Sequence, residues 1–184
     1  ASLMFQQAIH SARHRGWIAG PYFVPDEGVR AALQLAALRG VDVRVLIPNK
    51  PDHLLVYLSA FSFLGDMIDV GVKVFRYEPG FLHEKVFLVD DDAVGVGTAN
   101  LDNRSFRLNF EITAIVLDRS FAGEIEAMFL VDFTRSRLMT SEELTSKRWP
   151  FRLASRLAHL LARCSSGYSS SGWGSSSAVR RFTL

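Results

Sequence analysis

The stretch from His83 to Glu111, HEKVFLVDDDAVGVGTANLDNRSFRLNFE, decides the fold of this chain. Residues 84–90 (EKVFLVD) and 93–98 (AVGVGT) are rich in β-branched and apolar side chains, which predicts two strands. Asp91 and Asp92 lie between these runs and predict a tight turn. We therefore expect a β-hairpin in this stretch.

The hairpin also predicts where polar side chains meet. His83 and Lys85 are two residues apart, so they project from the same face of a strand. Thr98 and Asn100 follow the second run, and the turn returns them to the start of the first. An imidazole, a cation, an amide and a hydroxyl suit the neutralisation and attack of a phosphodiester. We predict a phosphate-handling site at one end of a sheet.

The rest of the chain predicts strands and helices around this hairpin. Before the hairpin, strand and helix periodicities alternate, which indicates parallel strands joined by right-handed crossovers. The expected strands are residues 17–24, 41–47, 72–77 and 110–117, and the expected helices are residues 3–14, 26–39, 52–69 and 119–137. The fold class that we predict is a layered α/β/α sandwich with a mixed, largely parallel sheet.

Composition divides the chain into three parts. Residues 1–140 are expected to form the main domain, because 48% hydrophobic residues are ample for a core. Residues 141–163 are expected to form a basic amphipathic helix, with five Lys or Arg and no acid from 144 to 163. This helix could lie on an anionic membrane or pack its apolar face on the domain. Residues 164–184 are rich in Ser and Gly, which predicts disorder.

Charge and cysteine content narrow the class of protein. A net charge of +2 is too small to indicate a nucleic-acid partner by itself. The single cysteine, Cys164, excludes a disulfide within the chain and favours a reducing compartment. The sequence has no apolar run long enough to predict a transmembrane helix. Because it starts with Ala1 rather than Met, we expect a fragment of a longer protein.

Six residues fit the pattern His-x-Lys, four residues, Asp, six residues, Gly-Ser/Thr-x-Asn, and these are His83, Lys85, Asp90, Gly97, Thr98 and Asn100. The pattern resembles the HKD motif of the phospholipase D superfamily, which implies a phospholipase D-like fold. The flanking residues 21–26 (PYFVPD), 80–83 (GFLH) and 100–106 (NLDNRSF) resemble the C-terminal catalytic half of bacterial cardiolipin synthases. This resemblance extends over about residues 3 to 163.

The resemblance implies transfer of a phosphatidyl group from one phosphatidylglycerol to the hydroxyl of another, which gives cardiolipin and glycerol. His83 is expected to attack and form a phosphohistidine intermediate, while Lys85 and Asn100 neutralise the phosphate. A superfamily acid in the place of Glu111 orients the motif histidine, although from spacing alone Glu111 could equally be an exposed acid at a strand end. The implied catalytic residues are His83, Lys85, Asp90, Asn100 and Glu111, and the implied substrate-binding residues are Thr98 and Ser105. Asp90 also closes its strand, which favours a structural role.

The resemblance also implies partners. The leaving glycerol needs a second acid, which in the superfamily is the histidine of a second HKD motif, and either histidine could take either role. This chain has a single His-x-Lys. We expect the second motif to come from another half of the full-length protein or from a second copy, and the isolated monomer to be inactive. The other expected partners are phosphatidylglycerol and an anionic membrane surface, without nucleic acid, metal or cofactor. The expected location is peripheral, at the bacterial cell membrane.

Two other interpretations stay open on the sequence. The chain could be a homodimeric HKD phosphodiesterase or nuclease, although that function favours a more basic domain. It could also be a non-catalytic lipid-binding fragment, because a single motif is followed by an unusual Ser/Gly-rich segment.

Overall fold

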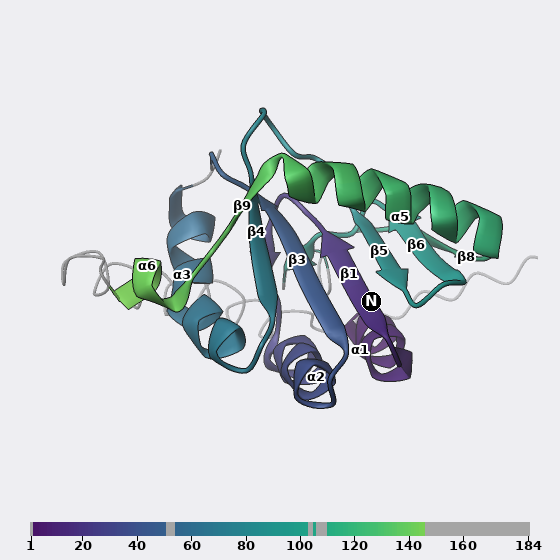
Figure 1. The fold of residues 1–184 in the computed structure, drawn as a ribbon, viewed down its shortest axis with the longest axis horizontal. Helices are drawn as coiled ribbons and strands as arrows, with labels where there is room; N and C mark the ends of the chain where they lie inside the picture. Colours follow the sequence, from purple (N-terminus) through teal and green to yellow (C-terminus); the bar gives the residue numbers. More distant parts are fainter. Residues whose placement is uncertain (1, 51–53, 103–104, 106–109, 146–184) are drawn as a thin grey trace, which may run out of the picture.

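The computed structural model describes residues 2–50, 54–102, 105 and 110–145. A seven-stranded sheet, in the order β8-β6-β5-β1-β3-β4-β9, carries helices on both faces (Figure 1). Its strands are β1 (Arg15–Ala19), β3 (Asp42–Pro48), β4 (Lys73–Tyr77), β5 (Val86–Val89), β6 (Ala93–Gly97), β8 (Thr113–Leu117) and β9 (Ser136–Leu138). The helices are α1 (Ser2–Ser11), α2 (Glu27–Leu38), α3 (Leu54–Asp69), α5 (Arg119–Thr134) and α6 (Ser141–Thr145). The layers and the mixed sheet confirm the predicted α/β/α class.

Parallel pairing in this sheet is confined to its middle. Strand β1 pairs with β3, and β3 with β4, in parallel, with α2 and α3 as the predicted connections. The other four pairings, β1 with β5, β5 with β6, β6 with β8 and β4 with β9, are antiparallel. The sheet is therefore less parallel than the sequence predicted, because the β5–β6 hairpin and the edge strands run against their neighbours.

One expected strand is divided in two, and one expected helix ends early and is followed by a strand. The expected strand 17–24 is divided into β1 and β2 (Phe23–Val24), and β2 pairs in parallel with the short β7 (Leu101–Asp102) in a separate sheet. The expected helix 119–137 ends at Thr134, and β9 follows it along the edge of β4. At this junction the Ser136 hydroxyl donates to the Asp132 carbonyl oxygen at 2.6 Å. Local periodicity predicted a helix as far as residue 137, but residues 136–138 pair with β4 instead.

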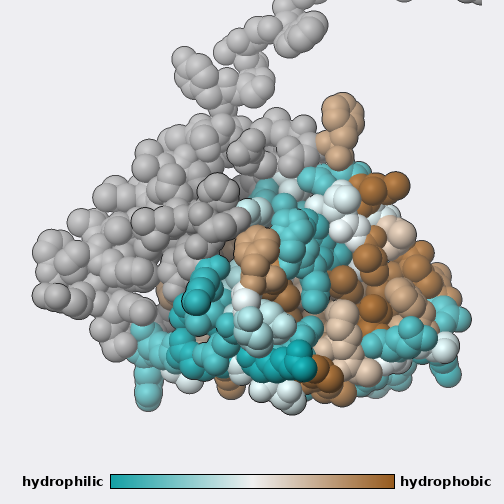
Figure 2. Space-filling view, turned by 90° about the horizontal axis from the view of Figure 1, so that it is seen from above, coloured by the Kyte–Doolittle hydropathy of each residue, from teal (hydrophilic) through white to brown (hydrophobic). Residues whose placement is uncertain are grey.

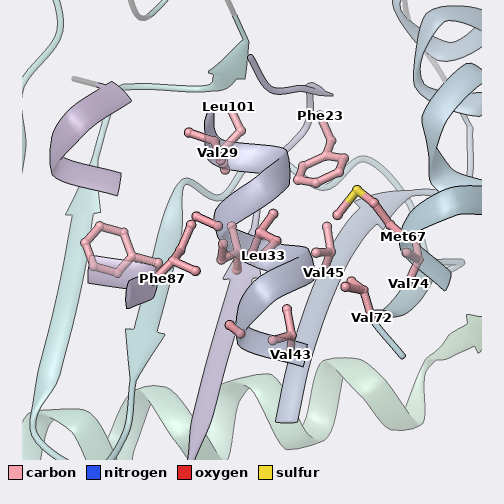
Figure 3. Packing of buried hydrophobic residues seen from close by; sticks show 14 of the residues in the cluster. Phe23, Val29, Leu33, Val43, Val45, Met67, Val72, Val74, Phe87 and Leu101 are labelled. Carbon is pink, nitrogen blue, oxygen red and sulfur yellow. The ribbon is translucent and has the colours of Figure 1, made fainter. Parts of the chain in front are cut away.

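Alternating strand residues build a core on each face of the sheet. On one face, Ile18 and Val45 pack with residues of α1, α2 and α3 (Figure 3). On the other face, Trp17 and Leu88 pack with residues of α5, where Trp17 meets Phe129 edge to face at 5.9 Å. Neighbouring strand residues thus serve opposite cores, as strand geometry requires. Both faces of the central strands are covered, which leaves the ends of the sheet for a site.

The last described element, α6, contacts α3. The Ser141 hydroxyl donates to Asp69 Oδ1 at 2.6 Å, and the preceding Met139 is buried in the core that α3 helps to form. The remainder of the predicted basic helix, residues 146–163, and the Ser/Gly-rich segment 164–184 lie outside the described residues. Within the described ranges, no helix is both long and apolar enough to cross a membrane.

Candidate active site

All the predicted site residues except Asp90 lie at the end of the sheet where β1, β3 and β4 finish, at the top of Figure 1. Strand β5 begins here, with Val86 opposite Ala19, the last residue of β1. Strand β6 ends here, with Gly97 opposite Thr113, the first residue of β8. The segments that carry the predicted polar residues therefore leave the sheet at one edge. Sites in α/β proteins are commonly found at the carboxyl ends of parallel strands.

His83 and Lys85 lie in the irregular segment before β5, and not on the strand as predicted, because pairing with β1 ends at Ala19. The Lys85 ammonium donates to the His83 carbonyl oxygen at 3.1 Å. The Gly97 N–H donates to the Lys85 carbonyl oxygen at 3.1 Å and ties this segment to the end of β6. The predicted β5–β6 hairpin is confirmed, and it brings His83 and Lys85 to the side of the residues that follow β6.

The imidazole of His83 is exposed and stacks on Phe81. The two ring centroids are 5.4 Å apart and the ring planes differ by 24°. Between them in sequence, Leu82 is buried in the core under α5, which anchors this segment to the domain. Sequence reasoning missed Phe81, although an aromatic residue two positions before His83 was an available signal.

Thr98 holds the carboxylate of Glu111. The Thr98 hydroxyl donates to Glu111 Oε2, and the same hydroxyl oxygen accepts the Ile112 N–H at 3.1 Å. The Thr98 N–H donates to the Ile112 carbonyl oxygen at 2.9 Å, which closes the link between the ends of β6 and β8. The resemblance implied that Glu111 orients His83, and the hydrogen bond to Thr98 is a contact of Glu111 that was not predicted. A carboxylate is thus fixed at the edge of the site.

Lys85 and Glu111 interact electrostatically across the site. Partial burial lowers the pKa of the Lys85 ammonium, and the Glu111 carboxylate opposes this shift without cancelling it. The ammonium has lost part of its hydration, so an arriving anion would find it a favourable partner. No group of three or more His, Cys, Asp or Glu side chains that could hold a metal ion occurs in the described ranges.

Two polar atoms in the segment after Thr98 are buried and have no hydrogen-bond partner among the described residues. They are Oδ1 of Asn100 and Oγ of Ser105. The backbone of Ser105 is held separately, because its N–H donates to Asp102 Oδ1 at 2.8 Å. Buried polar atoms in folded proteins nearly always have a hydrogen-bond partner, so these two atoms are suited to a hydrogen bond with a ligand.

Asp90 lies at the opposite end of β5 and is not part of this cluster. Its carboxylate accepts the backbone N–H groups of Arg13, His14 and Arg15 at 2.8–3.1 Å. The length of β5 separates it from Lys85 by roughly 16 Å, at about 3.3 Å per residue. The backbone of Asp90 has φ 50°, in the left-handed region, where it turns the hairpin. Asp90 therefore ties the hairpin turn to the start of β1.

We expect Asp90→Ala to destabilise the fold by about 2–3 kcal/mol, because three backbone donors lose a charged acceptor. Asp90→Asn should lose roughly half as much, since the amide oxygen still accepts and Asn tolerates the left-handed region. Burial raises the pKa of the Asp90 carboxyl, but the three hydrogen bonds outweigh it and lower the pKa below its usual 3.8. The stability from this group is therefore present above that value and lost as the pH falls through the lower folded pKa.

Denaturant unfolding of the parent and Asp90→Ala, compared at neutral pH and near pH 3, measures both effects. The difference in unfolding free energy between the parent and Asp90→Ala should be smaller near pH 3 than at neutral pH. A difference that is independent of pH would contradict the role of the ionised carboxylate.

Glu84, between His83 and Lys85, interacts electrostatically with Asp132 of α5. The sequence predicted a role for neither residue. Oε2 of Glu84 and Oδ2 of Asp132 are buried, and neither has a hydrogen-bond partner among the described residues. Burial raises the pKa of the Glu84 carboxyl, and the nearby Asp132 carboxylate raises it further. Burial also raises the pKa of Asp132, which Arg135 partly opposes. Two carboxyl groups thus share a poorly solvated space behind the segment of His83.

We expect Glu84→Gln to be more stable than the parent at neutral pH, by about 1 kcal/mol. In the unfolded chain the Glu84 carboxyl ionises at its usual pKa of 4.5, whereas its pKa in the folded protein is higher. The parent therefore loses stability as the pH rises from the unfolded pKa to the folded pKa. Below the unfolded pKa, both states are protonated and the gain should vanish. Thermal unfolding at neutral and acidic pH checks this, with the exposed α5 residue Glu124→Gln as the control. A Glu84→Gln protein less stable than the parent at neutral pH would contradict the pairing.

Comparison with known proteins adds a family match to this geometry. A family model described as "Cardiolipin synthase, PLD-like domain" matches residues 5–132. Over 161 residues, the chain is 56% identical to cardiolipin synthase A of Pseudomonas putida (strain GB-1), a match that covers 88% of this chain and 34% of that protein. Cardiolipin synthase A of Pseudomonas aeruginosa (strain LESB58) is 55% identical, with 88% and 33% covered. The chain spans about a third of the length of these curated relatives.

Solved structures share the fold. Nuc from Salmonella typhimurium, a phospholipase D family member, superimposes with a TM-score of 0.67 at 20% identity, over 76% of this chain and 90% of that chain. The phosphatidylserine synthase of Haemophilus influenzae gives 0.68 at 17% identity, over 87% and 42%. At these identities the likeness shows a common architecture, which is the predicted phospholipase D-like fold.

Proposed function

Because this chain belongs to the cardiolipin synthase, PLD-like domain family, we propose that it supplies one of two HKD motifs for phosphatidyl transfer between two phosphatidylglycerol molecules. The products are cardiolipin and glycerol. The observation that carries the proposal is the convergence of His83, Lys85 and the Thr98–Glu111 pair at one end of the sheet. This set offers a nucleophile, a cation and a fixed carboxylate to one phosphodiester.

In the first step, a ring nitrogen of His83 attacks the phosphorus of the donor lipid. An N–P bond forms, the P–O bond to the headgroup glycerol breaks, and the glycerol oxygen takes a proton from a second acid. Lys85 neutralises the phosphate oxygens, the side-chain N–H of Asn100 and the hydroxyl of Ser105 donate hydrogen bonds to them, and Thr98 positions Glu111. Glu111 is the acceptor that we assign to the other ring nitrogen of His83, which fixes the tautomer for attack.

In the second step, the hydroxyl of another phosphatidylglycerol attacks the phosphohistidine. That hydroxyl gives its proton to the group that acted as acid before, a new P–O bond forms and the N–P bond breaks. One phosphodiester bond is exchanged for another, so the transfer needs no nucleotide. Lys85 acts by charge in both steps.

The second acid is the histidine of another HKD motif. The curated relatives are about three times as long as this match, so a second motif can come from another part of a full-length protein. A second copy of the chain is the other source, through a two-fold interface. We propose that a strictly monomeric chain of this length does not turn over.

Lipid-product analysis tests the function on a protein that contains this chain and its second motif. Thin-layer chromatography with phosphatidylglycerol should show cardiolipin, glycerol should be released, and plasmid DNA should stay intact. Activity should survive EDTA, because Lys85 supplies the positive charge. DNA cleavage without lipid transfer would favour the nuclease, and loss of activity that only a divalent cation restores would contradict the metal-free mechanism. The 184-residue chain alone, shown to be monomeric by light scattering, should be inactive.

We further propose peripheral attachment to an anionic membrane through residues 144–163. This span carries five Lys or Arg and no acid, and each basic residue near an anionic surface contributes about 1 kcal/mol. We expect co-sedimentation with phosphatidylglycerol vesicles that weakens as salt is added. Equal binding to neutral and anionic vesicles would show that these charges do not attach the protein.

A further inference from the structure

Exposed apolar side chains border the polar cluster. Phe81 is 57% exposed, Ile112 is 74% exposed and Phe110 is fully exposed. We call Phe81, Phe110 and Ile112 the apolar rim. Large apolar residues so exposed are usually part of a binding surface when they gather in one place.

The apolar rim is tied directly to the residues that would meet a phosphate. The Phe81 ring stacks on the His83 imidazole, and Phe110 and Ile112 flank Glu111 in sequence. The backbone of Ile112 exchanges two hydrogen bonds with Thr98, so its position is set by the site itself. A ligand that reached His83 and Lys85 would therefore touch apolar carbon at the same time.

The end of the molecule that carries the site continues into an apolar side. Figure 2 looks down on this end and shows hydrophobic residues gathered on the right, the side of Figure 1 on which β6 and β8 lie. The exposed Val96 and Ile115 belong to these two strands. Residues 112–117 (ITAIVL) contain no charged side chain, so this segment itself offers no cation to the phosphates of a nucleic acid.

We propose that the apolar rim binds the glycerol backbone and the first acyl carbons of the phosphatidyl donor, and so selects a diacyl phosphodiester at this site. A phospholipid joins an anionic diester to apolar chains within a few bonds, which is the same succession that His83, Lys85 and the rim present. This inference rests on the proposed function and adds residues that set its substrate preference. Burial of a few methylene groups against two rim side chains is enough to change affinity severalfold.

The test uses a protein that contains this chain and its second motif, with dihexanoyl and dibutyryl phosphatidylglycerol as monomeric substrates. The parent should prefer the longer lipid, measured as the ratio of kcat/KM for glycerol release. In Phe110→Ser and Ile112→Ser this ratio should fall by roughly tenfold, because the added methylenes lose their apolar contact. The control is Leu117→Ser, at the far end of β8 and 77% exposed, which should keep the parent ratio.

Three results would overturn the apolar rim as a lipid contact. A loss that is equal for both lipids would show that Phe110 and Ile112 hold another part of the protein. A parent without chain-length preference would show that no acyl carbon reaches the rim, and a matching change in Leu117→Ser would assign the effect to the whole edge of β8. If the proposed function itself is wrong, the parent will release glycerol from neither lipid. That result differs from the three above, and it also rules out the apolar rim as a lipid contact.

Discussion

His83→Ala is expected to abolish phosphatidyl transfer, with a fall of about four orders of magnitude or more, in a protein that contains both HKD motifs. Among the residues that the structure describes, no other histidine has the position of His83, before β5 and beside Lys85, from which an N–P bond could form. The fold should be unaffected, because the imidazole is exposed and stacks on the equally exposed Phe81. Glycerol release and thermal unfolding, measured on the same preparation, separate the two effects.

The matched control is His10→Ala, which removes another exposed imidazole at the end of α1. It should transfer phosphatidyl groups at the parent rate. A His83→Ala protein that keeps the parent rate would remove His83 as the nucleophile, and a His83→Ala protein that melts several degrees lower would show that the imidazole has a structural role.

Among the substitutions considered, Gly97→Ala should lower the free energy of unfolding the most, by about 3 kcal/mol or more. This corresponds to a fall of roughly 6–12 °C in Tm. A Cβ at this position would lie 2.7 Å from the Cα of Thr113 and closer still to the carbonyl oxygen of Ile112. Both are backbone atoms of the neighbouring chain segment, so no side chain can rotate away to relieve the overlap. Strand β8 would have to move away from β6, and the Thr98–Glu111 hydrogen bond would be stretched with it. Transfer activity should therefore fall together with stability.

Gly123→Ala is the control for this prediction. It adds the same methyl group inside α5, where the new Cβ would meet no atom within 4 Å apart from its chain neighbours and the nearby backbone of its own helix. It should stabilise the protein by about 0.5–1 kcal/mol because Ala favours a helix. Differential scanning calorimetry of both variants decides the matter. A Gly97→Ala protein that melts with the parent would show that the spacing of β6 and β8 is not tightly set.

The candidate site could be predicted where contacts follow from neighbours in the chain. His83 and Lys85 meet the residues after β6 because a tight hairpin, with three residues between the paired Val89 and Ala93, returns the chain to its start. Spacing and turn residues indicate such a hairpin. Glu111 is different, since its hydrogen bond to Thr98 joins residues 13 positions apart across segments that had no predicted register. Glu84 is different again, because Asp132, whose charge raises the pKa of its carboxyl group, belongs to a helix that begins more than thirty residues later. Those contacts depend on how the layers pack.

Periodicity, turn residues and residue spacing act over a few positions, so the sequence alone predicts the alternation of helices and strands, the β5–β6 hairpin and the chemical set of the HKD motif. The tertiary structure decided what that set touches. Asp90 shares the motif with His83, yet β5 runs from one end of the sheet to the other and delivers Asp90 to the backbone of residues 13–15, 75–77 positions away. Spacing along a strand gives the distance between two residues but not their surroundings, which are set by the strands and helices that pack at each end.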